Sequence, residues 1–221
     1  MSSMIESIMG MLSGDALNKV SQQIGVPESK AKEALPDVLA VLTGALAKNS
    51  SQEQGARELS NALAKDHDGS LLNNLSDYIS NYKQASGDGI LGHVLGNNRT
   101  TVEKSLSQKT GLDMGSIGNL LTMAAPLLMG MLGKTQKTEG LDIGGLTNLL
   151  GQESNQAQSL APGAINILSQ ILGAGGTQTT PQTTPQTGST TTKKRSGCAT
   201  VLIVLVIAVV VYFLLRACSI L

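Results

Sequence analysis

Residues 16–46 read ALNKVSQQIGVPESKAKEALPDVLAVLTGAL, and residues 102–132 read VEKSLSQKTGLDMGSIGNLLTMAAPLLMGML. At a spacing of 86 positions the two stretches align without gaps, and Gly25 and Gly44 coincide with Gly111 and Gly130. Apolar residues recur in both at the spacing of a helix face. The pair predicts an all-α fold that contains an internal two-fold sequence repeat of one helix–Gly–helix unit. Chance similarity between leucine-rich helices is the alternative.

Further helices are predicted on both sides of these units, so that residues 1–172 form a multihelical array with one sizeable core or two small ones. Ser3 and Glu6 have the spacing of a capping box and predict a helix that begins beside them. Pro36 predicts a kink or break at Leu35, because proline removes a helical N–H. The polar residues 134–140 predict a connection between helices.

The last part of the chain changes character twice. Residues 173–192, GAGGTQTTPQTTPQTGSTTT, have no charge and no large apolar side chain, which predicts a disordered tether that continues to residue 197. Residues 201–215 then read VLIVLVIAVVVYFLL. Counted from Cys198, the stretch before Arg216 has eighteen residues. At about 1.5 Å per residue this length approaches the roughly 30 Å of a bilayer core.

Residues 198–221 are therefore predicted to form one C-terminal transmembrane helix, with a buried helix of a soluble protein as the alternative. Its anchoring side chains are represented by Val201, Leu205, Val209 and Leu214.

The orientation of this helix is predicted from the charges beside it. Lys193, Lys194 and Arg195 precede the apolar run, and positive charge favours the cytoplasmic side of a span. The first residues lack a basic region and include Glu6, so they make a poor signal peptide. We expect a single-pass, tail-anchored membrane protein with a cytoplasmic N-terminal domain, whose first partner is the lipid bilayer.

Composition argues against nucleic-acid binding. Four of the 16 basic residues lie at or after residue 193, which leaves 12 against 16 acidic residues in the rest of the chain. A domain of this charge does not attract phosphates. The chain has no Trp, one Phe and three Tyr, too few aromatic rings for base stacking.

No catalytic constellation is evident. The sequence contains neither a GxSxG nor a GxxxxGK motif, and its two cysteines, Cys198 and Cys218, flank the predicted span. We therefore predict that the protein is not an enzyme and has no catalytic, cofactor-binding or metal-binding residue.

Two histidines leave one alternative open. His67 and His93 lie near DG turns with Asp68 and Asp88, and the four could form a metal site if the two turns met in space. The favoured interpretation is that Asp68 and Ser70 cap a helix and that His93 is half-buried.

The stretch from Met114 to Gly133 is uncharged and contains four methionines. Core packing is the favoured interpretation. An adaptable methionine-rich binding surface and a helix that enters the bilayer are the alternatives.

The helix–Gly–helix unit around Gly25, the turn His67-Asp68-Gly69-Ser70, the segment Gly89–Leu95 and the stretch from Ser107 to Gly133 together resemble the YidB-like family of bacterial proteins, a domain of unknown function. The resemblance covers residues 5–133 and implies an all-α fold without established catalytic residues. We expect a non-enzymatic scaffold or interaction module that binds a protein partner or a second copy of itself. A membrane-active or oligomeric protein that inserts into the bilayer is the alternative.

Overall fold

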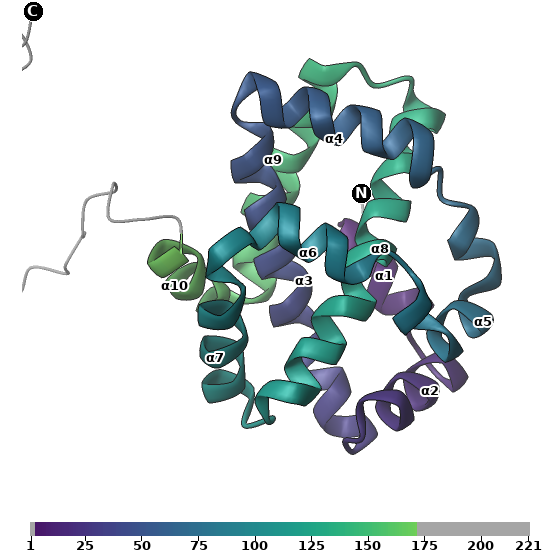
Figure 1. Ribbon diagram of the computed structural model, residues 1–221, viewed down its shortest axis with the longest axis vertical. Coiled ribbons are helices and arrows are strands. Elements are labelled where there is room, and N and C mark those ends of the chain that lie inside the picture. Colours follow the sequence, from purple (N-terminus) through teal and green to yellow (C-terminus); the bar gives the residue numbers. More distant parts are fainter. Residues whose placement is uncertain (1–2, 172–221) are drawn as a thin grey trace, which may run out of the picture. The chain divides into compact units, whose positions relative to one another are not determined.

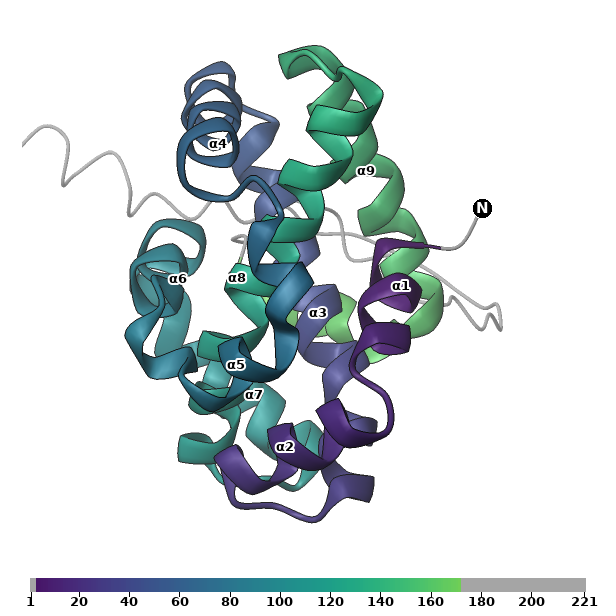
Figure 2. The same ribbon diagram turned by 90° about the vertical axis from the view of Figure 1, so that its right-hand side faces the viewer.

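The computed structural model describes residues 3–171, and this part of the chain is helical without β-strands (Figures 1 and 2). The all-α prediction is confirmed there. Several predicted features lie outside the described residues: the tether, the charges Lys193, Lys194 and Arg195, and the anchor positions Val201, Leu205, Val209 and Leu214.

The α-helices are α1 (Met4–Met11), α2 (Asp15–Ile24), α3 (Glu28–Ser50), α4 (Glu53–Asp66), α5 (Leu75–Ser80), α6 (Gly87–Leu95), α7 (Arg99–Thr110), α8 (Met114–Glu139), α9 (Ile143–Leu160) and α10 (Pro162–Ile171). Short 3-10 turns cover Ser70–Asn74 (η1), Tyr82–Gln84 (η2) and Gly96–Asn98 (η3).

Two long helices, α3 and α8, form the centre of the core, and the other helices surround them (Figure 2). Nearly every residue of α3 from Leu35 to Leu46 is buried, and so is most of α8 from Ile117 to Gly130. A helix that is apolar on all sides needs neighbours on all sides. Helices α9 and α10 supply part of this cover, since α3 contacts both, and its most extensive contact is with α9.

Both halves of the aligned pair form the same local structure. Helices α2 and α7 end at Gly25 and Gly111, whose φ angles of 73° and 72° lie in the left-handed region. Each glycine N–H donates to a carbonyl four residues earlier, that of Ser21 or Ser107. A long helix follows in both cases. The two units thus share a C-cap that favours glycine, and the sequence repeat itself stays a prediction.

Three local predictions can be compared with the structure. The capping box at Ser3 and Glu6 is confirmed, with hydrogen bonds of 2.9 and 3.0 Å. Of the predicted kink or break at Leu35, the break is wrong, because α3 continues through Pro36, and the kink stays a prediction. Proline removes one helical hydrogen bond, and buried residues on both sides of it hold the helix in place. The connection at residues 134–140 is also wrong, because α8 extends to Glu139 and ends at Gly140.

Candidate functional site

A cleft of about 650 Å³ lies between α4 and α6. Figures 1 and 2 show these helices one above the other on the same side of α8. Apolar side chains from four helices line the cleft: Leu46 of α3, Leu59 and Ala62 of α4, Ile90 and Val94 of α6, and Met129 of α8. Polar side chains complete the lining: Asn49, Gln52, Gln54, Glu58, Asp66, His67, Ser86 and His93.

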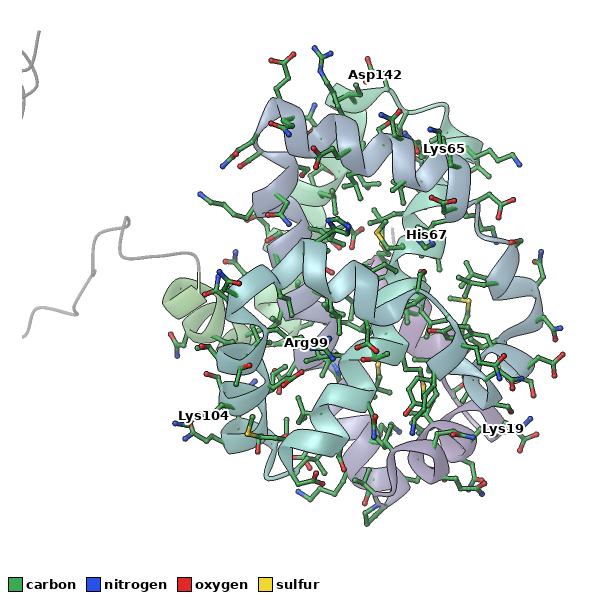
Figure 3. The ribbon with its side chains drawn as sticks, viewed as in Figure 1. Lys19, Lys65, His67, Arg99, Lys104 and Asp142 are labelled. Atoms are coloured by element: carbon green, nitrogen blue, oxygen red, sulfur yellow. The ribbon has the colours of Figure 1, made fainter. Side chains whose placement is uncertain are left out.

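His67 is the most deeply buried of these polar residues. It follows the last residue of α4 as the C-cap, and it is 8% exposed. Figure 3 shows it below the end of α4, toward α8. Within residues 3–171 its imidazole ring makes no hydrogen bond. Burial lowers the pKa of His67 from its usual 6.5, and the nearby charge of Asp66 only partly opposes this effect. At neutral pH the ring is therefore uncharged, with one free N–H donor and one free acceptor nitrogen.

The position of His67 depends on a close approach between its backbone and α8. A Cβ atom placed on Gly133 would stand 1.7 Å from the carbonyl oxygen of His67. Only glycine leaves room for this contact. One turn earlier, a Cβ on Gly130 would stand 3.0 Å from Cδ2 of Leu71. Gly130 and Gly133, on one face of α8, thus leave room for the turn after α4 to pack against this helix.

The same turn tests the interpretation that Asp68 and Ser70 cap a helix. Asp68 accepts a 2.9 Å hydrogen bond from the backbone N–H of Ser70, and this bond holds the pKa of the Asp68 carboxyl below its usual value. Asp68 therefore stabilises a local turn just before η1. The predicted helix cap by Asp68 and Ser70 is wrong, because the N-cap of η1 is Gly69 and no side chain forms a cap hydrogen bond there.

His93 reaches the cleft from the opposite side. It lies on α6, and Asn49 of α3 donates a 3.1 Å hydrogen bond to the carbonyl oxygen of the next residue, Val94. This bond ties the end of α6 to α3. His93 is exposed, rather than half-buried as the sequence suggested.

Only two of the four candidate metal ligands lie in the same cleft. Both histidines line the cleft, but Asp68 and Asp88 do not. Asp88 instead forms a 2.7 Å ion pair with Arg99, and Arg99 also pairs with Glu103 at 2.8 Å. The pair with Asp88 joins α6 to the first residue of α7, Arg99, which Figure 3 labels. In the part of the chain that the structure describes, no group of three or more His, Cys, Asp or Glu residues could hold a metal ion.

The cleft is electrostatically one-sided. Glu58 and Asp66 are exposed carboxylates at its edge, and no lysine or arginine lines it. Gln54 donates a 2.8 Å hydrogen bond to Glu58 and holds that carboxylate in place. The cleft therefore has an apolar interior, the buried imidazole of His67 and an anionic edge.

The methionine-rich stretch proves to be core. It forms most of α8, which among the described helices alone has the length and hydropathy of a membrane span. Yet 78% of its most apolar window is buried within the fold. Met123 and Met129 are buried, whereas Met114 is exposed. Burial against neighbouring helices thus accounts for the apolar composition, and only Met129 reaches the cleft.

Sequence reasoning missed most of the cleft residues. It singled out His67 and His93, but not Asn49, Glu58 or Asp66. Asp66 is next to His67 in the sequence, but no sequence motif includes Asn49 or Glu58.

Comparisons with known proteins give one result. Residues 6–135 match a family described as bacterial protein of unknown function (DUF937). This range agrees with residues 5–133, which carry the resemblance noted above. The match supports a bacterial domain of unknown function, but it does not name the YidB-like family. Searches of the curated proteins and of the solved structures found no match.

Proposed function

The chain belongs to the DUF937 family of bacterial proteins of unknown function, and we propose that it is a non-enzymatic binding module held at the cytoplasmic face of a membrane. The cleft between α4 and α6 carries the binding part of this proposal. It combines an apolar interior with a few converging polar groups, and its volume of about 650 Å³ lies within the roughly 300–1,000 Å³ usual for ligand pockets. The narrower kinship with the YidB-like proteins is part of the same proposal and rests on the shared turns.

The membrane part of the proposal rests on residues 193–221. The eighteen residues at 198–215 approach the length needed to cross a bilayer core, and the basic cluster at 193–195 favours a cytoplasmic domain. Fractionation of cells that express the full chain, or a chain ending at residue 192, tests the anchor. The full chain should sediment with membranes and the shorter chain should not. A shorter chain that stayed in the membrane would contradict the proposal.

The two cysteines allow a sharper test of orientation. Cys198→Ser leaves Cys218 as the only thiol, and this thiol should react with a membrane-impermeant maleimide added outside spheroplasts. A matched chain without either native cysteine but with Ser51→Cys carries its thiol at an exposed position in the described domain. That thiol should react only after the membrane is opened. The reverse pattern would place the domain outside the cytoplasm.

A membrane-active protein is the second candidate, and α8 is the observation that favours it. For α8 to enter a bilayer, the buried 78% of its apolar window would have to leave its neighbours. Leakage of dye from liposomes on addition of residues 1–172 would support this second function. Intact liposomes would support the binding module.

A further inference from the structure

The deepest polar group in the α4–α6 cleft has no partner, and this observation points to a ligand. His67 is 8% exposed, lines the cleft, and makes no hydrogen bond through its ring to any of residues 3–171. In the described residues the fully buried side-chain atoms without a partner are those of Thr43 and Tyr82, and the ring nitrogens of His67 are not among them. The ring is therefore open to the cleft, where a ligand can reach it.

The free ring restricts what the ligand can offer. Because burial lowers the pKa of His67, its neutral ring presents one donor and one acceptor together. A peptide group carries the matching pair, a carbonyl oxygen and an N–H. The apolar side chains of Leu46, Leu59 and Met129 beside it are buried at 3%, 8% and 4% exposure. They form a surface on which an apolar side chain can pack.

The edge of the cleft restricts the ligand further. Glu58 and Asp66 bring two carboxylates, and no cationic side chain among the lining residues neutralises them. The one positive charge near Glu58 on the same helix, Arg57, pairs with Glu53. A ligand with a positive charge next to its apolar part would complement this edge, and arginine can contact carboxylates through two hydrogen bonds.

We propose that the α4–α6 cleft binds a segment of a partner protein in which an apolar residue stands next to an arginine or lysine. The apolar side chain enters the cleft over Leu59 and Met129, the peptide group bonds to the ring of His67, and the cation reaches Glu58 and Asp66. This inference rests on the proposed function, since it names the partner chemistry of the binding module.

The full chain contains two histidines, which makes a direct test practical. The full-length protein is purified in detergent micelles without a histidine tag and labelled with ¹³C-histidine. Its NMR spectrum then contains the imidazole signals of two histidines, and His93→Gln leaves those of His67. The probes are an acetylated and amidated Leu-Arg-Leu peptide, the charge-reversed Leu-Glu-Leu peptide, and n-hexylammonium.

We expect Leu-Arg-Leu to shift the His67 signal in a saturable manner and Leu-Glu-Leu to leave it in place at the same concentrations. The double substitution Glu58→Gln and Asp66→Asn should weaken peptide binding at least tenfold. Both residues are exposed, so the fold should persist, and circular dichroism checks it. Glu28→Gln and Glu139→Gln together remove the same amount of charge at exposed positions outside the cleft lining, and this pair should change the affinity less than twofold.

Three results would overturn the inference. The first is a His67 signal that Leu-Arg-Leu does not move. The second is equal binding of the charge-reversed peptide or of the double variant. The third is hexylammonium binding as tightly as the peptide, which would make the ligand a small organic cation. Because the peptide test runs in micelles, a negative result would not contradict the proposed membrane anchor. A negative fractionation test would likewise not contradict peptide binding in the cleft.

Discussion

The carboxylate of Glu153 accepts a 2.8 Å hydrogen bond from the backbone N–H of Met4, 149 positions earlier in the chain. Glu153 lies on α9 and is 7% exposed, and Met4 is the first residue of α1. The bond therefore satisfies one of the free N–H groups at the start of α1. Both residues fall outside the range 6–135 that matches the family, so this chain closes its fold with contacts beyond the family domain.

Substitution of Glu153 should change how stability depends on pH. Burial raises the pKa of Glu153 above its usual 4.5, Glu6 adds to the rise, and the bond from Met4 opposes it. The folded state then binds a proton more tightly than the unfolded state, so stability falls as the pH rises from about 4.5 through the raised pKa. Glu153→Gln keeps an acceptor oxygen and should remove this fall. Glu153→Ala should cost about 1–3 kcal/mol by leaving the Met4 N–H unpaired.

Urea unfolding of both Glu153 variants between pH 4 and 8 checks this prediction. A wild-type pH slope in Glu153→Gln would contradict it.

Gly133→Ala should destabilise the domain by about 1–3 kcal/mol, because the new Cβ would overlap the carbonyl oxygen of His67 and the backbone must move. Gly151→Ala is the matched control. Gly151 lies within α9, and a Cβ there would meet nothing within 4 Å. Alanine should stabilise that helix by about 0.5–1 kcal/mol. Urea unfolding by circular dichroism measures both changes, and equal signs would show that the turn does not need this approach.

The ion pair between Asp37 and Lys109 joins α3 to α7, with side chains 13% and 34% exposed. Asp37→Asn should lower the free energy of unfolding by about 1–3 kcal/mol, less than for a fully buried pair because water still reaches Lys109. The exposed pair of Lys30 and Glu33 serves as the comparison. Glu33→Gln should change stability by about 0.5 kcal/mol or less. Thermal unfolding of the two variants would refute the prediction if their costs were the same.

Two tyrosines should respond to loss of the hydroxyl with opposite signs. Tyr82 is 1% exposed, and its hydroxyl has no hydrogen-bond partner within residues 3–171. Tyr82→Phe removes this unpaired group and should stabilise the domain by about 1 kcal/mol. The hydroxyl of Tyr78 donates a 2.6 Å hydrogen bond to the carbonyl oxygen of Met123. Tyr78→Phe should therefore cost about 1 kcal/mol. Chemical denaturation compares them, and destabilisation by both would show that Tyr82 has a partner.

The imidazole of His67 should titrate below pH 6.5, because burial lowers its pKa. The unfolded chain then binds the proton more tightly than the folded domain, so stability is lost as the pH falls from about 6.5 through the lowered pKa. His67→Leu should remove this part of the pH dependence. NMR titration of the ¹³C-labelled imidazole gives the midpoint. A midpoint at or above 6.5 would mean that the ring is solvated or paired with an acid.

Local features of the fold were predictable where short-range chemistry decides them. The capping box at Ser3 and the helix ends at Gly25 and Gly111 depend on a few neighbouring residues. The continuation of α3 through Pro36 and of α8 to Glu139 was missed. Tertiary packing holds α3 together across its proline, and α8 ends only at Gly140.

By itself, the sequence determined that the N-terminal part is helical and where two of its helices end, because periodicity and glycine caps are local properties. It also determined that residues 198–215 form a hydrophobic stretch whose length approaches that of a membrane span. Only the tertiary structure decided that α8 is core and that His67 and His93 share one cleft without Asp68 and Asp88. Those relations depend on which helices touch. Gly133 sets one such contact, since the absence of one side chain on α8 admits the backbone of His67.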